Sequence, residues 1–441
     1  MILSASPASY RQVMHLAWPV ILSNLSVPLL GAVDTAVIGH LPDASKLGAV
    51  AVGALVFSFL YWGFGFLRMG TTGFVSQAHG AGDATEIRAI LARALLLGAG
   101  GTVLILLFQV PVVKIALSLV EASPDVSAGA EIYFKTRVWG APAVLVNYCL
   151  LGMFIGLGKT KAALITQVFM NAVNIVLDLV FVMGLDMGVS GVALATAMAE
   201  YMAVIVGAIL LYRELNRLGG QWVRAQIFSF GEIKKLMSVN RDIFIRTILL
   251  IFAFAYFTAS AAKIGVETLA ATAVAMNFMN FLAFGLDGFA FAAESMVGNA
   301  IGARQPEKLR EVVISSSVLA VAVSVGYAVL YAVMGEVFIN MLTSIEAVRE
   351  DAYQYLPWLI LMPVVAVWSY QFDGIFIGAM RTKEMRNGMI YAFVAYFIAI
   401  EVLGNIWGIH GLWAALVVFM IARGVSLAAV YPRVKAAALT P

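Results

Sequence analysis

The sequence predicts an all-α polytopic membrane protein, in which twelve transmembrane helices form two pseudo-symmetric six-helix lobes. The first observation is composition: of the 441 residues 62% are hydrophobic and 12% are charged, with a mean hydropathy of +0.93. A soluble domain carries about 25% charged residues, so this chain is typical of a protein that lies mostly in lipid. The second observation is a series of long apolar runs, and the third is a set of short motifs that recurs in the two halves.

Each apolar run is close to the ~20 residues that a helix needs to cross the hydrocarbon core of a bilayer. We therefore expect about twelve transmembrane helices, several of them tilted or extended because their runs approach ~25 residues. Their predicted bounds are 13–39, 47–69, 87–113, 128–151, 161–183, 189–212, 239–262, 269–297, 309–333, 353–377, 387–407 and 411–431.

Lysine and arginine are concentrated in every second loop, and the loop after the sixth span holds Arg213, Arg217 and Arg224 among others. Cytoplasmic loops carry an excess of these two residue types. We therefore expect a multi-pass protein of the cytoplasmic (inner) membrane with both termini in the cytoplasm. The opposite set of loops offers mainly Lys46, Lys114, Lys263 and Arg349.

The long loop divides the chain into an N-terminal six-helix lobe at 1–212, a cytoplasmic loop at 213–238 and a C-terminal six-helix lobe at 239–441. The segment GMFIGLGKTKAALI at 152–165 matches GIFIGAMRTKEMRN at 374–387, and GVSGVALA at 188–195 resembles GIHGLWAA at 408–415. Matches in the same order indicate a duplication. Because each half has an even number of spans, both halves have the same orientation, a plan that secondary transporters often use.

The first span combines two unusual residues. Pro19 removes a backbone hydrogen bond and favours a bend, and Asp34 places a carboxylate where ionisation in hydrocarbon is costly. We expect this helix to be a moving part that bends at Pro19, although a proline can also kink a static helix.

Further polar side chains lie inside spans four to six. Asp178 and Asn174 are four residues apart and share one helix face, while Thr196 and Tyr133 lie in neighbouring spans. With Asp34 they supply hard oxygen donors suited to H⁺ or a small cation, so Na⁺ at Asp34, Asn174, Asp178 and Thr196 is an alternative to H⁺. Two close carboxylates in a low dielectric tend to retain one proton, which would couple protonation to helix repacking. Interhelical hydrogen bonds for Thr196 and Asn174, and interface anchoring for Tyr133, are the alternatives.

The second half has its own candidates, Asp373 and Glu401. A transport role for them and an ion pair with Arg246 or Arg423 are both open. Three more acids fall at membrane depth, namely Glu200, Asp287 and Glu294.

No motif of a known enzyme class is present: the chain has no phosphate-binding loop ending in GK[ST], no HExxH and no GxSxG. The single cysteine and the four scattered histidines form no metal-binding pattern. We expect neither an enzyme nor a cofactor beyond the coupling ion. We also expect no nucleic-acid partner, and a chain that works as a monomer.

The stretch AWPVILSNLSVPLLGAVDTAVIGHL, the following LGAVAVGALVFSFLYWGFGFLRMGTTGFVSQAHGAGD and the repeated GxFIGxxxTK elements resemble the multidrug and toxic compound extrusion (MATE) family, in its DinF-like branch. The resemblance covers essentially the whole chain. It implies a V-shaped pair of lobes that exports amphipathic or cationic drugs or toxins in exchange for H⁺ or Na⁺. It also implies a first-lobe cation site at Asp34, Tyr133, Asn174, Asp178 and Thr196, with the helix bend at Pro19.

The NorM-like branch of this family uses a second pair of acids, in spans seven and ten. Asp373 matches the second of them, whereas span seven reads RTILLIFAFAYF and has no acid. H⁺ coupling is therefore favoured over Na⁺. The alternatives are a lipid-linked oligosaccharide flippase on a related two-lobe plan, which would need a cationic cavity, and an intramembrane transferase, which would need a catalytic His or Asp at the membrane edge.

Overall fold

The computed structural model describes residues 5–39, 44–120 and 123–439, with the side chains of all of these except 29–39 and 44. Every regular element in the described residues is a helix. Eleven helical stretches among them are long and apolar enough to cross a membrane. Helix α1 (Pro7–Gly39) is a further long helix. The predicted all-α fold class is therefore confirmed.

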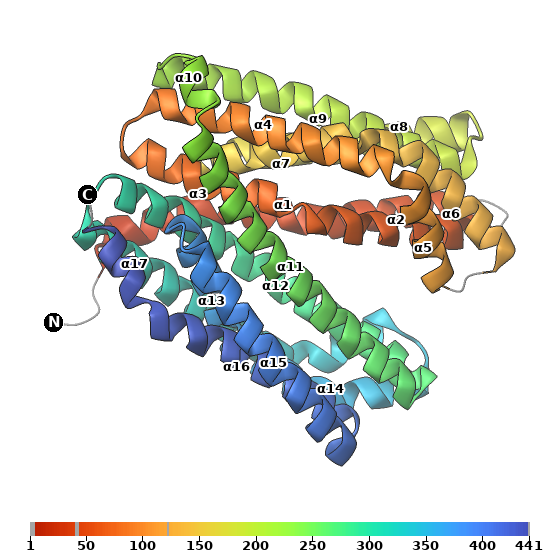
Figure 1. Ribbon diagram of the computed structural model, residues 1–441. Coiled ribbons are helices and arrows are strands. Elements are labelled where there is room, and N and C mark those ends of the chain that lie inside the picture. The colour runs from red at the N-terminus through yellow and green to blue at the C-terminus, as the bar shows by residue number, and fades with distance from the viewer. Residues whose placement is uncertain (1–4, 40–43, 121–122, 440–441) are drawn as a thin grey trace. The chain divides into compact units, whose positions relative to one another are not determined.

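By their contacts, the residues form two compact units, which are Leu22–Asn240 and the combination of Met1–Ile21 with Arg241–Pro441. The lobe boundaries predicted near 212 and 239 stay a prediction. In the first unit the helices α4, α7, α8 and α9 lie side by side (Figure 1). Its elements are α2 (Ala44–Gly63), α3 (Phe66–Gly80), α4 (Ala84–Leu107), α5 (Gln109–Val120), α6 (Pro124–Arg137), the 3₁₀ turn η1 (Val138–Gly140), α7 (Ala141–Gly156), α8 (Thr160–Asp178), the π-helical η2 (Leu179–Gly184), α9 (Gly188–Leu218) and α10 (Arg224–Ile227).

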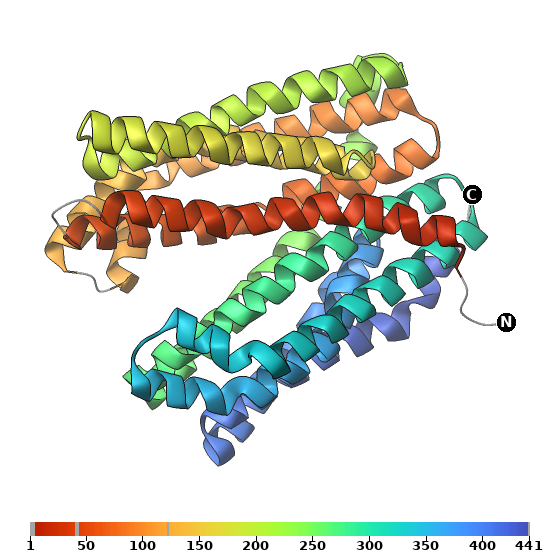
Figure 2. The same ribbon diagram turned by 180° about the vertical axis from the view of Figure 1, so that it is seen from behind.

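The second unit contains the first part of α1 and most of α11, and its neighbouring helices α12 and α13 are seen together in Figure 2. Gly288 of α12 lies so close to α1 that a Cβ atom there would approach Ile21 Cγ1 to 2.4 Å. The elements are α11 (Phe230–Ile264), α12 (Val266–Gly302), α13 (Pro306–Leu342), α14 (Glu346–Gly378), α15 (Thr382–Trp407), α16 (Ile409–Val430) and α17 (Pro432–Ala437).

The recurrent glycine motif has the same packing role in both halves. A Cβ atom on Gly152 of α7 would lie 2.6 Å from the carbonyl oxygen of Arg68 on α3. On α14, a Cβ atom on Gly374 would lie 2.3 Å from the carbonyl oxygen of Ala290 on α12. Small residues four apart let helix backbones approach closely in a membrane. The duplicated sequence is therefore the signature of one close helix pair that occurs in each half.

Two predicted spans end early as single helices for local reasons. The span expected at 87–113 ends as α4 at Leu107, because Pro111 lacks the N–H that would bond the carbonyl of Leu107. The span expected at 47–69 ends as α2 at Gly63, and α3 begins at Phe66 after Gly65. Glycine weakens a helix interior, and two of them close together favour this break.

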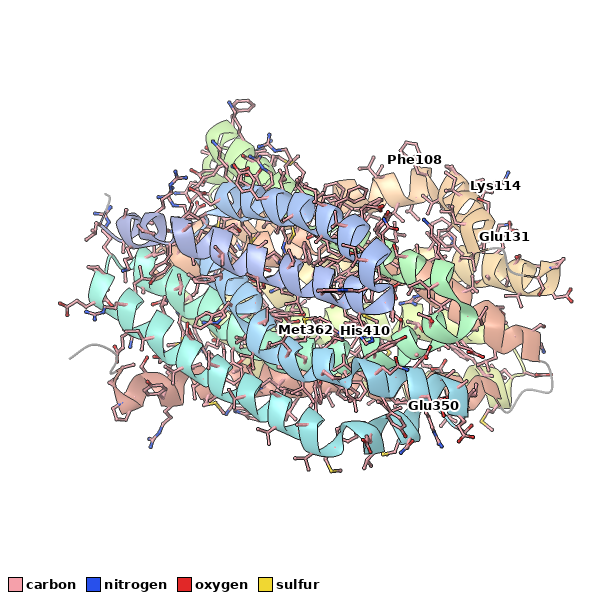
Figure 3. All side chains as sticks on the ribbon, turned by 90° about the horizontal axis from the view of Figure 1, so that it is seen from below. Phe108, Lys114, Glu131, Glu350, Met362 and His410 are labelled. Carbon is pink, nitrogen blue, oxygen red and sulfur yellow. The ribbon has the colours of Figure 1, made fainter. Side chains whose placement is uncertain are left out.

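The outer faces of the helices carry large apolar side chains, such as Leu119 (78% exposed) and Val333 (73%). Exposed apolar side chains of this kind suit contact with lipid tails. His410, at the start of α16 (Figure 3), accepts a hydrogen bond on Nδ1 from Trp358 Nε1 at 3.1 Å.

Candidate functional site

The carboxylate predicted in the fifth span is fully buried. Asp178 is the last residue of α8, and the six residues that follow form the π-helical η2. Asn174, one turn earlier, is also buried. Short π-helical segments frequently occur at functional sites, because the extra residue per turn re-aims side chains. The sequence pattern predicted one continuous span here and did not indicate η2.

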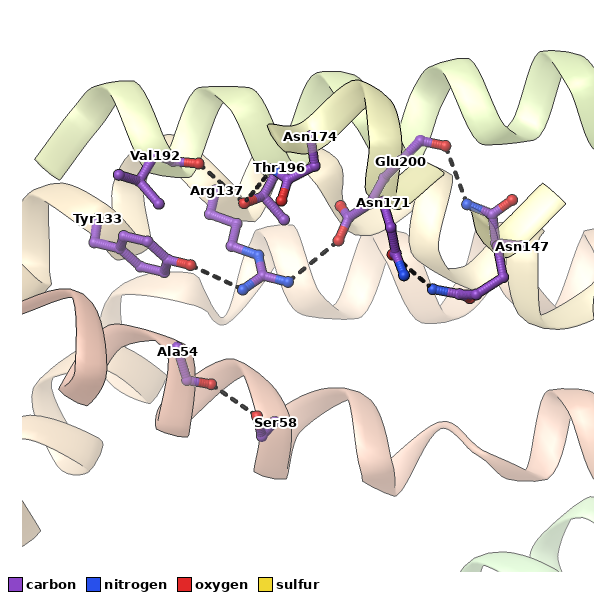
Figure 4. A network of polar contacts seen from close by, with 11 residues as sticks. Ala54, Ser58, Tyr133, Arg137, Asn147, Asn171, Asn174, Val192, Thr196 and Glu200 are labelled. Carbon is purple, nitrogen blue, oxygen red and sulfur yellow. Dashed lines mark hydrogen bonds and ion pairs between the residues drawn. The ribbon is translucent and has the colours of Figure 1, made fainter. Parts of the chain in front are cut away.

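Two of the predicted residues meet across the interface of α8 and α9 (Figure 4). Asn174 Nδ2 donates to Thr196 Oγ1 at 3.4 Å, a long hydrogen bond. Thr196 Oγ1 in turn donates to the carbonyl of Val192 at 2.9 Å. Asn174 and Asp178 are one turn apart on α8, so Thr196 lies beside the polar face that carries the buried carboxylate.

Tyr133 is linked to α9 through a residue that the sequence analysis did not single out. The Tyr133 hydroxyl accepts a hydrogen bond from Arg137 Nη1 at 2.9 Å, and Arg137 Nη2 pairs with Glu200 Oε1 at 3.2 Å. Glu200 follows Thr196 by one turn of α9. Figure 4 shows this chain of contacts between α6 and α9. The signal was present in the sequence, because Arg137 is a basic residue inside an apolar span and Glu200 is an acid at similar depth.

Aromatic rings complete the surroundings of the Arg137 guanidinium. Its Cζ lies 5.0 Å from the ring centre of Phe57, 5.8 Å from that of Tyr133 and 6.0 Å from that of Tyr61. These distances suit cation–π attraction, which strengthens where water is excluded. A positive charge at membrane depth is thus held by one carboxylate, one phenol hydroxyl and aromatic faces.

The break in the fourth span makes room for Glu200. Residues Val138–Gly140 form a 3₁₀ turn between α6 and α7. A Cβ atom on Gly140 would lie 2.5 Å from Glu200 Oε2 and 3.2 Å from Ala197 Cβ, so a larger residue there would displace the carboxylate.

The first helix is described in part. Helix α1 runs as one continuous helix from Pro7 to Gly39, and Pro19 is buried in the unit that contains residues 241–441. The side chain of Asp34 lies outside the described residues. On the same helix, Ser26 accepts a hydrogen bond from Asn171 Nδ2 of α8 at 2.8 Å, which ties this part of α1 to the helix that carries Asp178.

The two candidates in the second half have different partners. The Asp373 carboxylate accepts hydrogen bonds from Arg246 and from Arg423 Nη2, the second at 2.7 Å, and all three residues are buried. Asp373 therefore forms an ion pair with both arginines, while its role in transport stays a prediction. Glu401 is exposed on α15 and accepts a hydrogen bond from the Tyr256 hydroxyl.

Comparison with known proteins agrees with the duplication and the fold. The MatE family model matches residues 19–180 and again 243–404. The chain is 42% identical to the DNA damage-inducible protein F of Escherichia coli K12 over 429 residues, which cover 97% of this chain and 93% of that protein. It is 23% identical to the probable multidrug resistance protein NorM of Bacillus anthracis, over 92% of each chain.

The fold also matches a solved structure of a multidrug resistance MATE family transporter of the MOP superfamily in an outward-facing conformation. The TM-score is 0.89 at 19% identity, over 97% of this chain and 96% of that one. Family match, sequence identity and fold point to a membrane transporter and not to an enzyme. The chain therefore belongs to the MATE family of multidrug and toxic compound extrusion transporters, in its DinF-like branch.

Proposed function

We propose that this transporter exports amphipathic, often cationic, organic compounds in exchange for protons that enter the cell, and that Asp34 and Asp178 exchange those protons. The observation that carries the proposal is the full burial of Asp178 beside Asn174 and Thr196. An acid in the middle of a membrane helix is costly when ionised, so such residues usually lie on an ion or proton pathway. The name of the NorM relative supports a drug substrate.

The polar contacts of the second unit support a proton site in the first one. The negative charge of the Asp373 carboxylate is already balanced by Arg246 and Arg423. A cation would therefore compete with two guanidinium groups for its oxygens. The first unit offers Asp178 with an amide and a hydroxyl, which suffices for a proton. Na⁺ needs several oxygen ligands at once, and Asp34, Asn174, Asp178 and Thr196 are the set that would have to supply them.

The coupling step in this proposal is a movement of α1. Protonation removes the charge that keeps a carboxylate near polar partners, and α1 contains Pro19, where the helix lacks one backbone hydrogen bond. Bending of α1 at Pro19 would then follow the protonation state of Asp34 and Asp178. The protein would act as a monomer in the cytoplasmic membrane, with both termini in the cytoplasm.

The test is efflux of a fluorescent cationic dye from proteoliposomes, first with an imposed pH gradient and then with an imposed Na⁺ gradient. The proposal predicts efflux driven by the pH gradient in the absence of Na⁺, and its loss in Asp34→Asn and Asp178→Asn. Glu350→Gln is the matched control, because Glu350 is an exposed acid near the first turn of α14 (Figure 3). Efflux driven only by the Na⁺ gradient would overturn the proposal that H⁺ is the coupling ion. No dye movement under either gradient would overturn the proposed substrate class.

A further inference from the structure

A pocket of about 140 Å³ lies inside the unit formed by Leu22–Asn240. It is lined by residues of α7, α8 and α9, and its wall is mostly apolar. Five polar residues also line it, namely Asn147 and Tyr148 of α7, Thr166 and Gln167 of α8, and Glu200 of α9. A space of this size with several polar partners can hold ordered water molecules, whereas a purely apolar one of the same size stays dry.

Two buried oxygens of the pocket-lining residues have no hydrogen-bond donor among the described residues, and ordered water could supply one. Glu200 Oε1 is engaged by Arg137, but Glu200 Oε2 has no hydrogen-bond partner in the part of the chain that the structure describes. The same holds for Asn147 Oδ1, although Asn147 Nδ2 donates to the backbone carbonyl of Glu200 at 3.0 Å. The Glu200 side chain is 8% exposed. Buried polar atoms in native proteins are almost always hydrogen-bonded to protein or ordered water, so water in the pocket is the expected donor.

Glu200 lies on α9 one turn beyond Thr196, which contacts the polar face of α8. Thr196, one turn earlier on α9, accepts the hydrogen bond from Asn174, and Asp178 lies one turn beyond Asn174 on α8. The pocket is thereby joined to the buried carboxylate by successive turns of two packed helices. Gln167, on the pocket wall, donates a hydrogen bond to Asn171 Oδ1 at 3.0 Å. Asn171 Nδ2 in turn donates to Ser26 Oγ of α1 at 2.8 Å.

We propose that Glu200 is a further proton-exchanging carboxylate of this transporter, supplied by water in the pocket, with Arg137 as its counter-charge. The inference rests on the proposed proton-coupled export. A hydronium ion in the pocket gives its proton to Glu200 and leaves as water. Neutral Glu200 releases Arg137, which keeps its charge and its hydrogen bond to Tyr133. The proton then passes along the polar face towards Asp178, and Arg137 pairs with Glu200 again.

The groups that face Glu200 suit this role. Arg137 supplies the positive charge from α6, and on the α8 side the pocket wall carries the uncharged Thr166 and Gln167. The other titratable neighbours are phenols, which are neutral at physiological pH. They are Tyr61 of α2, Tyr133 of α6, Tyr148 of α7 and Tyr201 of α9.

The first experiment reads protonation and needs no transport. Infrared difference spectra of the purified protein are recorded while the pH is raised, for the wild type and for Glu200→Gln. The proposal predicts a protonated-carboxyl band that vanishes on titration in the wild type and is reduced in Glu200→Gln. Glu336→Gln, which changes an exposed acid of α13, should give the wild-type spectrum. Identical difference spectra for the wild type and Glu200→Gln would overturn the proposal.

The second experiment separates a proton carrier from a structural ion pair. Glu200→Gln alone leaves Arg137 without its carboxylate and can fail to fold, so the double variant Glu200→Gln/Arg137→Gln removes both charges. The proposal predicts that the folded double variant still binds the dye and loses most efflux driven by the pH gradient. Wild-type efflux in the double variant would show that the pair only balances charge and would overturn the proposal. If the wild type moves no dye, the proposed export fails, and the infrared experiment still decides whether Glu200 exchanges a proton.

Discussion

Gly374 of α14 lies against the backbone of Ala290 on α12 so closely that a Cβ atom would come within 2.3 Å of its carbonyl oxygen. Gly152 of α7 has the same relationship with Arg68 on α3. The recurrent GxFIG element therefore records a packing requirement that each half of the duplicated chain has kept. This packing requirement explains why the two halves share the motif. It does not imply that both halves carry an ion-coupling site.

Replacing either glycine with alanine should destabilise the helix pair that it joins. Because the obstacle is backbone and not a flexible side chain, we expect Gly374→Ala and Gly152→Ala to cost about 1–3 kcal/mol, as overpacking typically does. The measurement is thermal unfolding in detergent. Gly326→Ala is the control, because a Cβ atom there has nothing within 4 Å. Equal stability of all three variants would show that the close approach is not required.

Removing the acid of the second unit should damage folding more than it damages coupling. Asp373→Asn leaves Arg246 and Arg423 buried without a carboxylate, and breaking a buried ion pair on one side typically costs about 3–5 kcal/mol. We expect a lower yield of folded protein and a lower unfolding temperature. Glu401→Gln should keep the wild-type stability, since Glu401 is exposed. A stable Asp373→Asn variant that loses only transport would instead make Asp373 part of the transport site.

The pH dependence of efflux should depend on Asp178. At a fixed pH difference, wild-type efflux should slow as both sides are made more alkaline, because the carboxylates then have fewer protons to exchange. Asp178→Asn has no proton to exchange at this position, so its residual efflux should respond less to pH than that of the wild type. Dye efflux at several paired pH values measures this. A variant that keeps the wild-type pH profile would remove Asp178 from the coupling mechanism.

Pro19 should affect the rate of turnover and not the binding of substrate. Pro19→Ala restores a backbone N–H inside α1 and should stiffen the helix, so we expect slower efflux with unchanged dye affinity. Pro28→Ala is the matched control on the same helix. The proposal is contradicted if Pro19→Ala transports at the wild-type rate, or if Pro28→Ala is equally slow.

Hydrophobic runs predict the spans of this chain well, because each must cover the thickness of a bilayer. The face shared by Asn174 and Asp178 is likewise predictable, because it follows from helical spacing alone. The pairing of Arg137 with Glu200 is not, because it depends on how α6 and α9 pack across 63 residues of sequence. The ion pair of Asp373 likewise depends on the positions of two arginines that are distant in the sequence. The π-helical turn after Asp178 leaves no recognisable pattern in the sequence.

In the proposed exchange, binding of a cationic substrate displaces protons from Asp34 and Asp178. This displacement is tested most directly by adding a cationic substrate to the purified protein in weakly buffered detergent solution and measuring the protons released. The account predicts proton release on binding in the wild type, and its loss in both Asp34→Asn and Asp178→Asn. Substrate binding without proton release in the wild type would contradict it.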